Sequence, residues 1–258
     1  MCLTTRLNQA FQKLVPVPKA ILPEIGACPQ SSTIFFLTNN PKYSISLSRQ
    51  KRIPNRMMFK ELYQSLEKNG LYVFSAGDIR SFYRNESGTN LKRSILRWKN
   101  RGWLYTLKRG LYELTYPRDF TIPDMYIANK LYSPSYISLE TALSYYSIIP
   151  EVSMAVTSIT TKPTRRFKNK HGLFIYHAIQ AKAFTGYCVE KNGAFNILIA
   201  EPEKALIDYL YFRAHRNKQF NPAEERLDRG IITRLNRKKL TKYASLYNIS
   251  RKELYAYL

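Results

Sequence analysis

The sequence predicts an α+β protein, in which three short helices and a β-hairpin precede a mixed α+β domain with a mostly antiparallel sheet and C-terminal helices. Between residues 57 and 116, three helical patterns are followed by two short β-rich runs. After residue 150, β-branched and aromatic runs alternate with turn residues. Among the 258 residues, 45% are hydrophobic, so the chain can bury a substantial core.

The charge of the chain is strongly positive and unevenly distributed. The chain carries 41 Lys and Arg against 18 Asp and Glu, a formal net charge of +23. Residues 115–215 are nearly balanced, and the segments on either side are basic. This distribution is typical of a protein that meets a polyanion at particular surfaces. A coding bias that enriches Lys, Asn, Tyr and Ile throughout the chain is the alternative explanation.

Several protein classes are not expected from this composition. The sequence has no run of about 18 uncharged apolar residues, and prolines interrupt the apolar stretches near its start, so we expect neither a membrane span nor a signal peptide. Cys2, Cys28 and Cys188 are odd in number and far apart, which favours neither a disulfide framework nor a zinc finger. We expect a cytoplasmic protein.

Residues 1–56 differ from the rest of the chain. They are basic, contain six prolines and show no long helical periodicity, so we expect a poorly ordered extension. Met57 and Met58 stand directly before the first patterned helix. They suggest the hypothesis that the native protein starts there and that the extension is not translated.

Residues 57–116 predict three helices in succession. The first is indicated by apolar residues at helical spacing, namely Phe59, Leu62, Tyr63 and Leu66. Ser75, three residues before Asp78, is typical of an N-terminal cap and predicts a second helix that runs to about Tyr83. Thr89 or Asn90 can cap a third helix through Arg101.

The third helix separates an apolar face from a basic one. Leu91, Ile95 and Trp98 form its buried stripe, while the opposite side carries Arg93, Arg97, Asn100 and Arg101. Leu96 lies off the stripe, and the pattern assigns it no place. Guanidinium groups on such a face match phosphate oxygens or the edge of guanine.

A β-hairpin is predicted directly after this helix. Residues 103–107 and 111–114 are β-rich, and Lys108, Arg109 and Gly110 join them in a favoured three-residue connection. A basic hairpin tip beside a reading helix is typical of a wing, so residues 57–116 predict a winged helix-turn-helix DNA-binding domain. A solvated helix followed by an ordinary surface turn is the alternative.

Residues 120–258 predict the mixed α+β domain. Helices are expected over 124–131, from Ser138 to about Ser147, and from Pro202 onward. Strands are expected over residues 152–160, 173–179, 184–189 and 195–199. The tail is helical and basic, and Ser250 with Glu253 makes a capping box for the last helix.

Catalytic chemistry is weakly indicated. His171, His177 and His215 have no metal-ligand spacing, and the sequence contains no glycine-rich phosphate loop. Glu201, Glu203 and Asp208 leave a metal-dependent nuclease open as an alternative, since clustered carboxylates can hold Mg²⁺. We expect no catalytic residue, no metal ligand and no cofactor.

The motifs, taken in order, resemble a known family. Asp78-Ile79, residues 97–104 (RWKNRGWL) and residues 108–112 (KRGLY) resemble the winged-helix half of AbiEi-type antitoxins, transcriptional regulators of a viral defence system. Residues 134–143 (PSYISLETAL), Tyr176-His177 and residues 200–208 (AEPEKALID) are similar to that family's second domain. The resemblance implies a bacterial two-gene operon whose other product is a nucleotidyltransferase-like toxin.

The sequence therefore predicts a DNA-binding antitoxin that represses its own operon and counteracts the toxin through residues 120–258. The residues expected to read the major groove are Thr89, Asn90, Arg93, Ser94 and Arg97. Those expected to hold phosphates are Lys92, Lys99, Arg101, Lys108 and Arg109. An RNA-binding module is a further alternative, and the oligomeric state stays open.

Overall fold

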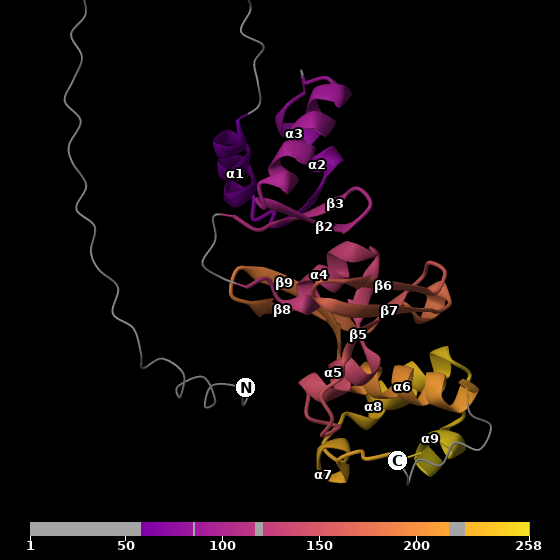
Figure 1. The fold of residues 1–258 in the computed structure, drawn as a ribbon. Coiled ribbons are helices and arrows are strands. Elements are labelled where there is room, and N and C mark those ends of the chain that lie inside the picture. The colour runs from indigo at the N-terminus through magenta and orange to yellow at the C-terminus, as the bar shows by residue number, and fades with distance from the viewer. Residues whose placement is uncertain (1–57, 85, 117–120, 217–224, 258) are drawn as a thin grey trace, which may run out of the picture. The chain divides into compact units, whose positions relative to one another are not determined.

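The computed structural model describes residues 58–84, 86–116, 121–216 and 225–257, and Figure 1 traces them. The protein is α+β, with helices and mostly antiparallel sheets, as the sequence predicts. The predicted extension over residues 1–56 lies outside the described residues, as do residues 117–120 between the two predicted domains.

The first part of the described chain combines three helices with a three-stranded sheet. Its strands pair antiparallel in the order β1-β3-β2. In chain order its elements are α1 (Phe59–Lys68), β1 (Val73–Ser75), α2 (Ala76–Phe82), α3 (Gly88–Asn100), β2 (Leu104–Lys108) and β3 (Leu111–Leu114).

The ends of these helices follow local hydrogen bonding. Ser75 and Asp78 form the predicted capping box, with side chain and backbone bonded in both directions. The cap of α3 is Ser87, whose hydroxyl accepts the Asn90 N–H at 3.2 Å, so the predicted caps Thr89 and Asn90 were wrong. An earlier cap lets the helix begin at Gly88.

These elements share one hydrophobic core. Trp98 of α3 is 1% exposed and packs among Leu62 and Leu66 of α1, Phe74 of β1 and Leu104 of β2. The ring of Phe59 lies 5.6 Å from that of Trp98. Burial of an aromatic ring of this size stabilises the fold by about 1.5–3 kcal/mol, so the apolar stripe of α3 is held inward.

The second part is built on a six-stranded sheet with the order β6-β7-β5-β4-β9-β8. The pairs β6·β7, β4·β5 and β8·β9 are antiparallel, and β5·β7 and β4·β9 are parallel. The strands are β4 (Ser135–Ile137), β5 (Ala155–Thr160), β6 (Arg165–Asn169), β7 (Gly172–Ala178), β8 (Tyr187–Asn192) and β9 (Phe195–Ala200).

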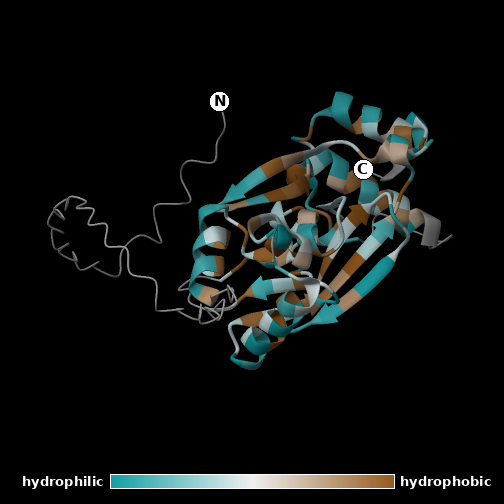
Figure 2. Cartoon of the chain, turned by 90° about the horizontal axis from the view of Figure 1, so that it is seen from above, coloured by the Kyte–Doolittle hydropathy of each residue, from teal (hydrophilic) through white to brown (hydrophobic). Residues whose placement is uncertain are grey.

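Helices complete this second part. They are α4 (Asp124–Leu131), α5 (Leu139–Tyr145), the short 3-10 helix η1 (Ala181–Ala183), α6 (Pro202–Arg216), α7 (Arg229–Ile232), α8 (Arg237–Leu246) and α9 (Arg251–Tyr257). Figure 2 shows hydrophilic (teal) and hydrophobic (brown) residues along the same strands and helices. None of the helices over the described residues is long and apolar enough to pass through a membrane.

Two strands of the large sheet were not predicted. Strand β4 is only three residues long and follows a proline, and β6 (sequence RRFKN) has one apolar residue. Strand β6 lies at the edge of the sheet, where its charged residues stay exposed, so hydrophobic alternation could not reveal it. The predicted capping box of Ser250 and Glu253 at the start of α9 is confirmed.

A buried carboxylate joins the hairpin to the large sheet. Glu113 of β3 is fully buried, and its Oε2 lies 2.7 Å from His171 Nε2 and 3.0 Å from Lys170 Nζ, both in the turn between β6 and β7. The hydroxyl of Tyr105 on β2 accepts the Lys170 N–H at 3.1 Å. Burial favours the neutral carboxyl, but the hydrogen bonds from His171 and Lys170 outweigh it and lower the pKa of Glu113 below its usual 4.5.

We predict that this junction makes the free energy of unfolding depend on pH in the acidic range. Because the folded pKa of Glu113 is below its unfolded value, its contribution is present above about pH 4.5 and is lost as the pH falls through the folded pKa. In urea titrations from pH 3 to 7, the unfolding free energy of Glu113→Gln should therefore fall less steeply below that point than that of the wild type. Glu67→Gln, at the exposed end of α1, is the control. Parallel curves for Glu113→Gln and the wild type would contradict the prediction.

Candidate nucleic-acid interface

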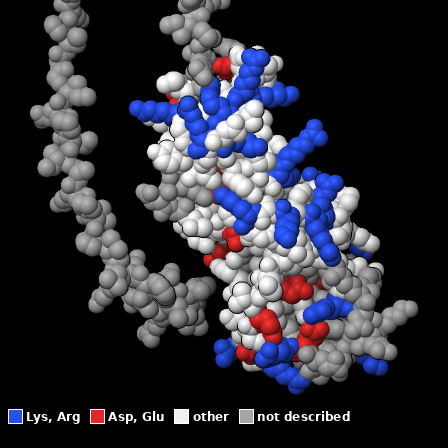
Figure 3. All heavy atoms as spheres, viewed as in Figure 1, with Lys and Arg blue, Asp and Glu red and all other residues white. Residues whose placement is uncertain are grey.

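The exposed face of α3 carries most of the predicted site. Leu91, Ser94, Ile95 and Trp98 turn inward. Lys92, Arg93, Lys99 and Asn100 are exposed on the other side. Arg101 follows as the C-cap, and Gly102, at φ 72°, turns the chain toward β2. In Figure 3, Lys and Arg side chains gather over the upper part of the molecule, where Figure 1 draws α1–α3.

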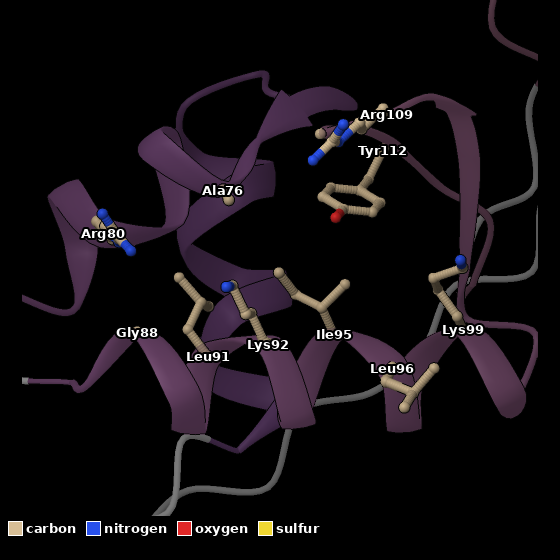
Figure 4. Close-up of a pocket in the computed structure, with 11 residues that line it drawn as sticks. Ala76, Arg80, Gly88, Leu91, Lys92, Ile95, Leu96, Lys99, Arg109 and Tyr112 are labelled. Carbon is tan, nitrogen blue, oxygen red and sulfur yellow. The ribbon is translucent and has the colours of Figure 1, made fainter.

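A groove lies along one side of α3. Its volume is about 410 Å³, and Ile95 of α3 and Tyr112 of β3 contribute to its apolar wall. Figure 4 shows its charged residues, which come from three elements: Arg80 of α2, Lys92 and Lys99 of α3, and Arg109 of the hairpin. The helix and the hairpin tip therefore present cations to the same groove.

A second, shallow groove lies on another side of the same helix, between side chains of α3 and its C-cap. It has a volume of about 350 Å³ and is lined by Arg93, Leu96, Arg97, Asn100 and Arg101. Arg97 Nη2 donates to Ser94 Oγ at 3.2 Å, and the guanidinium of Arg101 lies 4.9 Å from the ring centre of Trp103. Both contacts hold guanidinium groups in place on a largely exposed surface.

Five cations of this surface have no carboxylate partner within the described part of the chain. They are Lys92, Arg93, Lys99, Arg101 and Arg109. Uncompensated cations on two sides of one exposed helix produce a positive potential that attracts a polyanion. Two rows of such cations match a ligand with two lines of negative charge.

Eight of the ten predicted DNA-contacting residues lie on this surface. Those that are exposed are Thr89, Asn90, Lys92, Arg93, Lys99, Arg101 and Arg109, and Arg97 is half-buried. Ser94 is buried, at 7% exposure, and its hydroxyl accepts from Arg97. A buried hydroxyl cannot reach a base edge, so Ser94 positions Arg97 and is left out of the interface.

Lys108 also lies elsewhere than predicted. Its Nζ is 5.5 Å from the ring centre of Phe167 and 6.0 Å from that of Tyr132, both in the second part of the chain. Burial lowers the pKa of Lys108, and the nearby cations Lys162 and Arg165 lower it further. Lys108 is the last residue of β2, at a register shift of the strand pair, so it points away from its neighbour Arg109.

The sequence patterns missed two residues that line the grooves. Arg80 comes from α2, and only the fold brings it beside α3. Leu96 is 56% exposed and lines both grooves. Its outward direction follows from the helical period, so the signal was present in the sequence.

The acidic residues of the nuclease alternative are already engaged. Glu201 Oε2 accepts from Lys239 at 2.9 Å and from Tyr243 at 2.7 Å, and Glu203 Oε1 accepts the Asn236 N–H at 3.0 Å. Over the described residues, no group of three His, Cys, Asp or Glu side chains is arranged to hold a metal ion. The geometry thus offers the nuclease alternative no support.

Asp208 is part of a buried polar network. Asp208 and Lys204 are fully buried on α6 and form an ion pair one helical turn apart. Ser138 and Tyr136 donate to Asp208 at 2.8 and 3.1 Å. Tyr247, at the end of α8, bonds both charged groups. Burial lowers the pKa of Lys204, which Asp208 opposes. The network ties β4, α6 and α8 together.

Comparison with known protein families and with curated proteins finds no match to this chain.

We predict that breaking the buried pair destabilises the protein strongly. Asp208→Ala should lower the unfolding free energy by about 3–5 kcal/mol in urea denaturation, because it leaves Lys204 charged and buried without its partner. The double change Lys204→Met with Asp208→Leu should recover much of this loss. Asp228→Ala removes only the exposed cap of α7 and should cost about 1 kcal/mol. An equal cost for Asp208→Ala and Asp228→Ala would contradict this.

Proposed function

We propose that this protein is a sequence-specific repressor that binds duplex DNA through a winged helix-turn-helix formed by α1–α3 and β1–β3. In this proposal α3 is the recognition helix and the β2–β3 hairpin is the wing. The order of the elements and the antiparallel β1-β3-β2 sheet support it. The single observation that carries it is the pair of cation-lined grooves on two sides of α3.

The division of labour follows from side-chain chemistry. Arg93 and Arg97, with Thr89 and Asn90, would contact base edges in the major groove, since guanidinium groups donate two hydrogen bonds to guanine. Phosphates would be held by the cations on the flanks, which are Arg80, Lys92, Lys99, Arg101 and Arg109. Arg80 enters this set because it lines the groove, while Ser94 and Lys108 leave it.

We further propose that the protein is the antitoxin of a two-gene defence operon, acts in the cytoplasm and opposes a nucleotidyltransferase-like toxin. This part rests on the sequence resemblance to AbiEi-type antitoxins. Residues 120–258 would carry the activity against the toxin, and the protein would need no cofactor.

We predict a strong preference for the DNA upstream of its own gene. Fluorescence anisotropy at two salt concentrations should give an affinity for this duplex about a thousandfold higher than for a scrambled duplex. Equal affinities that both collapse with salt would mean that net charge alone drives binding. Stronger competition by single-stranded RNA than by duplex DNA would favour the RNA-binding alternative.

We predict different effects for the two groups of side chains. Arg93→Ala should reduce the discrimination between the two duplexes by about 1–3 kcal/mol, because it removes a contact to bases. Lys99→Ala should weaken binding to both duplexes alike and reduce the salt slope by about one unit. Lys182→Ala, which changes an exposed lysine of η1, is the matched control and should leave both quantities unchanged. If Arg93→Ala keeps full discrimination, α3 is not the recognition helix in the proposed orientation.

The toxin half of the proposal has a separate test. Co-expression of this chain with the neighbouring toxin gene should restore bacterial growth, and Arg93→Ala should restore it equally, because the proposal assigns toxin control to residues 120–258. Both genes are expressed from foreign promoters, so repression does not enter the result. Failure of the wild-type chain to restore growth would overturn the antitoxin assignment and leave the repressor assignment intact.

A further inference from the structure

Leu96 is a large apolar side chain at the centre of a charged surface. It is 56% exposed, and exposed residues on either side of it include Lys92, Arg93, Lys99 and Asn100. A single exposed leucine is ordinary on a protein surface. What distinguishes Leu96 is its position, because it lines both of the grooves that flank α3.

Leu96 lies near the outermost line of the helix. The four buried residues of α3 define the inward direction of the helix, and the outermost line lies opposite to it. With 3.6 residues per turn, Leu96 points about 30° from this outermost line. Thr89, two turns earlier, lies within about 10° of the same line. Leu96 therefore stands on the ridge between the two grooves.

This ridge has a definite counterpart in duplex DNA. The major groove is about 12 Å wide and a helix with its side chains about 10–12 Å across, so a docked helix fills the groove. The two sugar-phosphate backbones then run along the two flanks of the helix, where Lys92 and Lys99 line one groove and Arg101 lines the other. The ridge faces the base pairs.

The floor of the major groove has few apolar features. Adenine, guanine and cytosine present hydrogen-bond donors and acceptors there, while thymine adds its C5 methyl group. A leucine side chain can neither donate nor accept a hydrogen bond, so the methyl group is the feature it can recognise. We infer that Leu96 is a specificity-determining residue that contacts the C5 methyl group of a thymine in the bound DNA. This inference rests on the proposed function, and it adds a thymine to the bases that Arg93 and Arg97 are proposed to contact.

Deoxyuridine tests the contact atom by atom, because it differs from thymidine only in lacking this methyl group. The binding of wild type, Leu96→Ala, Leu96→Met and Leu173→Ala would be measured by anisotropy on the upstream duplex and on copies in which each thymine in turn is replaced by deoxyuridine. Leu173, on β7, is also an exposed leucine and serves as the matched control.

At one thymine of the site, or at one in each half-site, loss of the methyl group should weaken wild-type binding about fourfold, the factor that corresponds to about 0.8 kcal/mol for one buried carbon. At that position Leu96→Ala should bind the two duplexes equally, while Leu96→Met should keep part of the difference and Leu173→Ala all of it. Leu96 is exposed, so the alanine variant should melt at the wild-type temperature.

Two results would overturn the inference, and they differ from failure of the proposed function. One is that, at every thymine, replacement by deoxyuridine weakens the binding of Leu96→Ala as much as it weakens the binding of the wild type. The other is specific wild-type binding with no penalty at any thymine. If the wild type instead fails to distinguish the upstream duplex from the scrambled one, the repressor assignment falls, and the role of Leu96 falls with it.

Discussion

The candidate interface depends on the packing of Trp98 in the hydrophobic core. The indole of Trp98 lies against α1, β1 and β2, and with Leu91 and Ile95 it fixes the rotation of α3 about its own axis. A helix rotated by one residue, or 100°, would turn Leu96 toward the core and move the arginines off the groove. The cations themselves contribute little to this orientation, because they remain on the solvent-exposed face of the helix. The hydrophobic core thus sets the geometry of a charged surface.

Much of this arrangement could be predicted from local sequence signals. The capping box of Ser75 and Asp78, the apolar stripe of α3 and the glycine of the hairpin each depend on neighbouring residues, so each is visible in the sequence. Gly110, at φ 80°, takes the left-handed conformation that its turn requires. His177, one of the three histidines without metal-ligand spacing, is 6% exposed, and its ring lies 5.0 Å from that of Phe212.

Three of the errors have a common physical cause, which is tertiary context. Lys108 was placed at the hairpin tip with Arg109, but a register shift in β2 turns it toward the aromatic rings of Tyr132 and Phe167. Strand β6 was missed because strand pairing, and not burial of its own side chains, holds it in the sheet. Arg80 joins the site through a contact between helices. None of these three effects has a signature within a few residues of sequence.

Glu113 also connects the hairpin to the large sheet. Its two ion-pair partners, Lys170 and His171, belong to the turn between β6 and β7, so the hairpin that carries Arg109 is fastened to the large sheet at its base. His171 also lies 3.3 Å from Asp124 at the start of α4. Any molecule that binds this turn and changes the position of β3 would change the affinity of the hairpin for its own ligand. Thermodynamic linkage makes the effect reciprocal, since the ligand of the hairpin would change the affinity of that molecule by the same factor. The carboxylate of Glu113 therefore links β3 of the hairpin directly to the turn between β6 and β7.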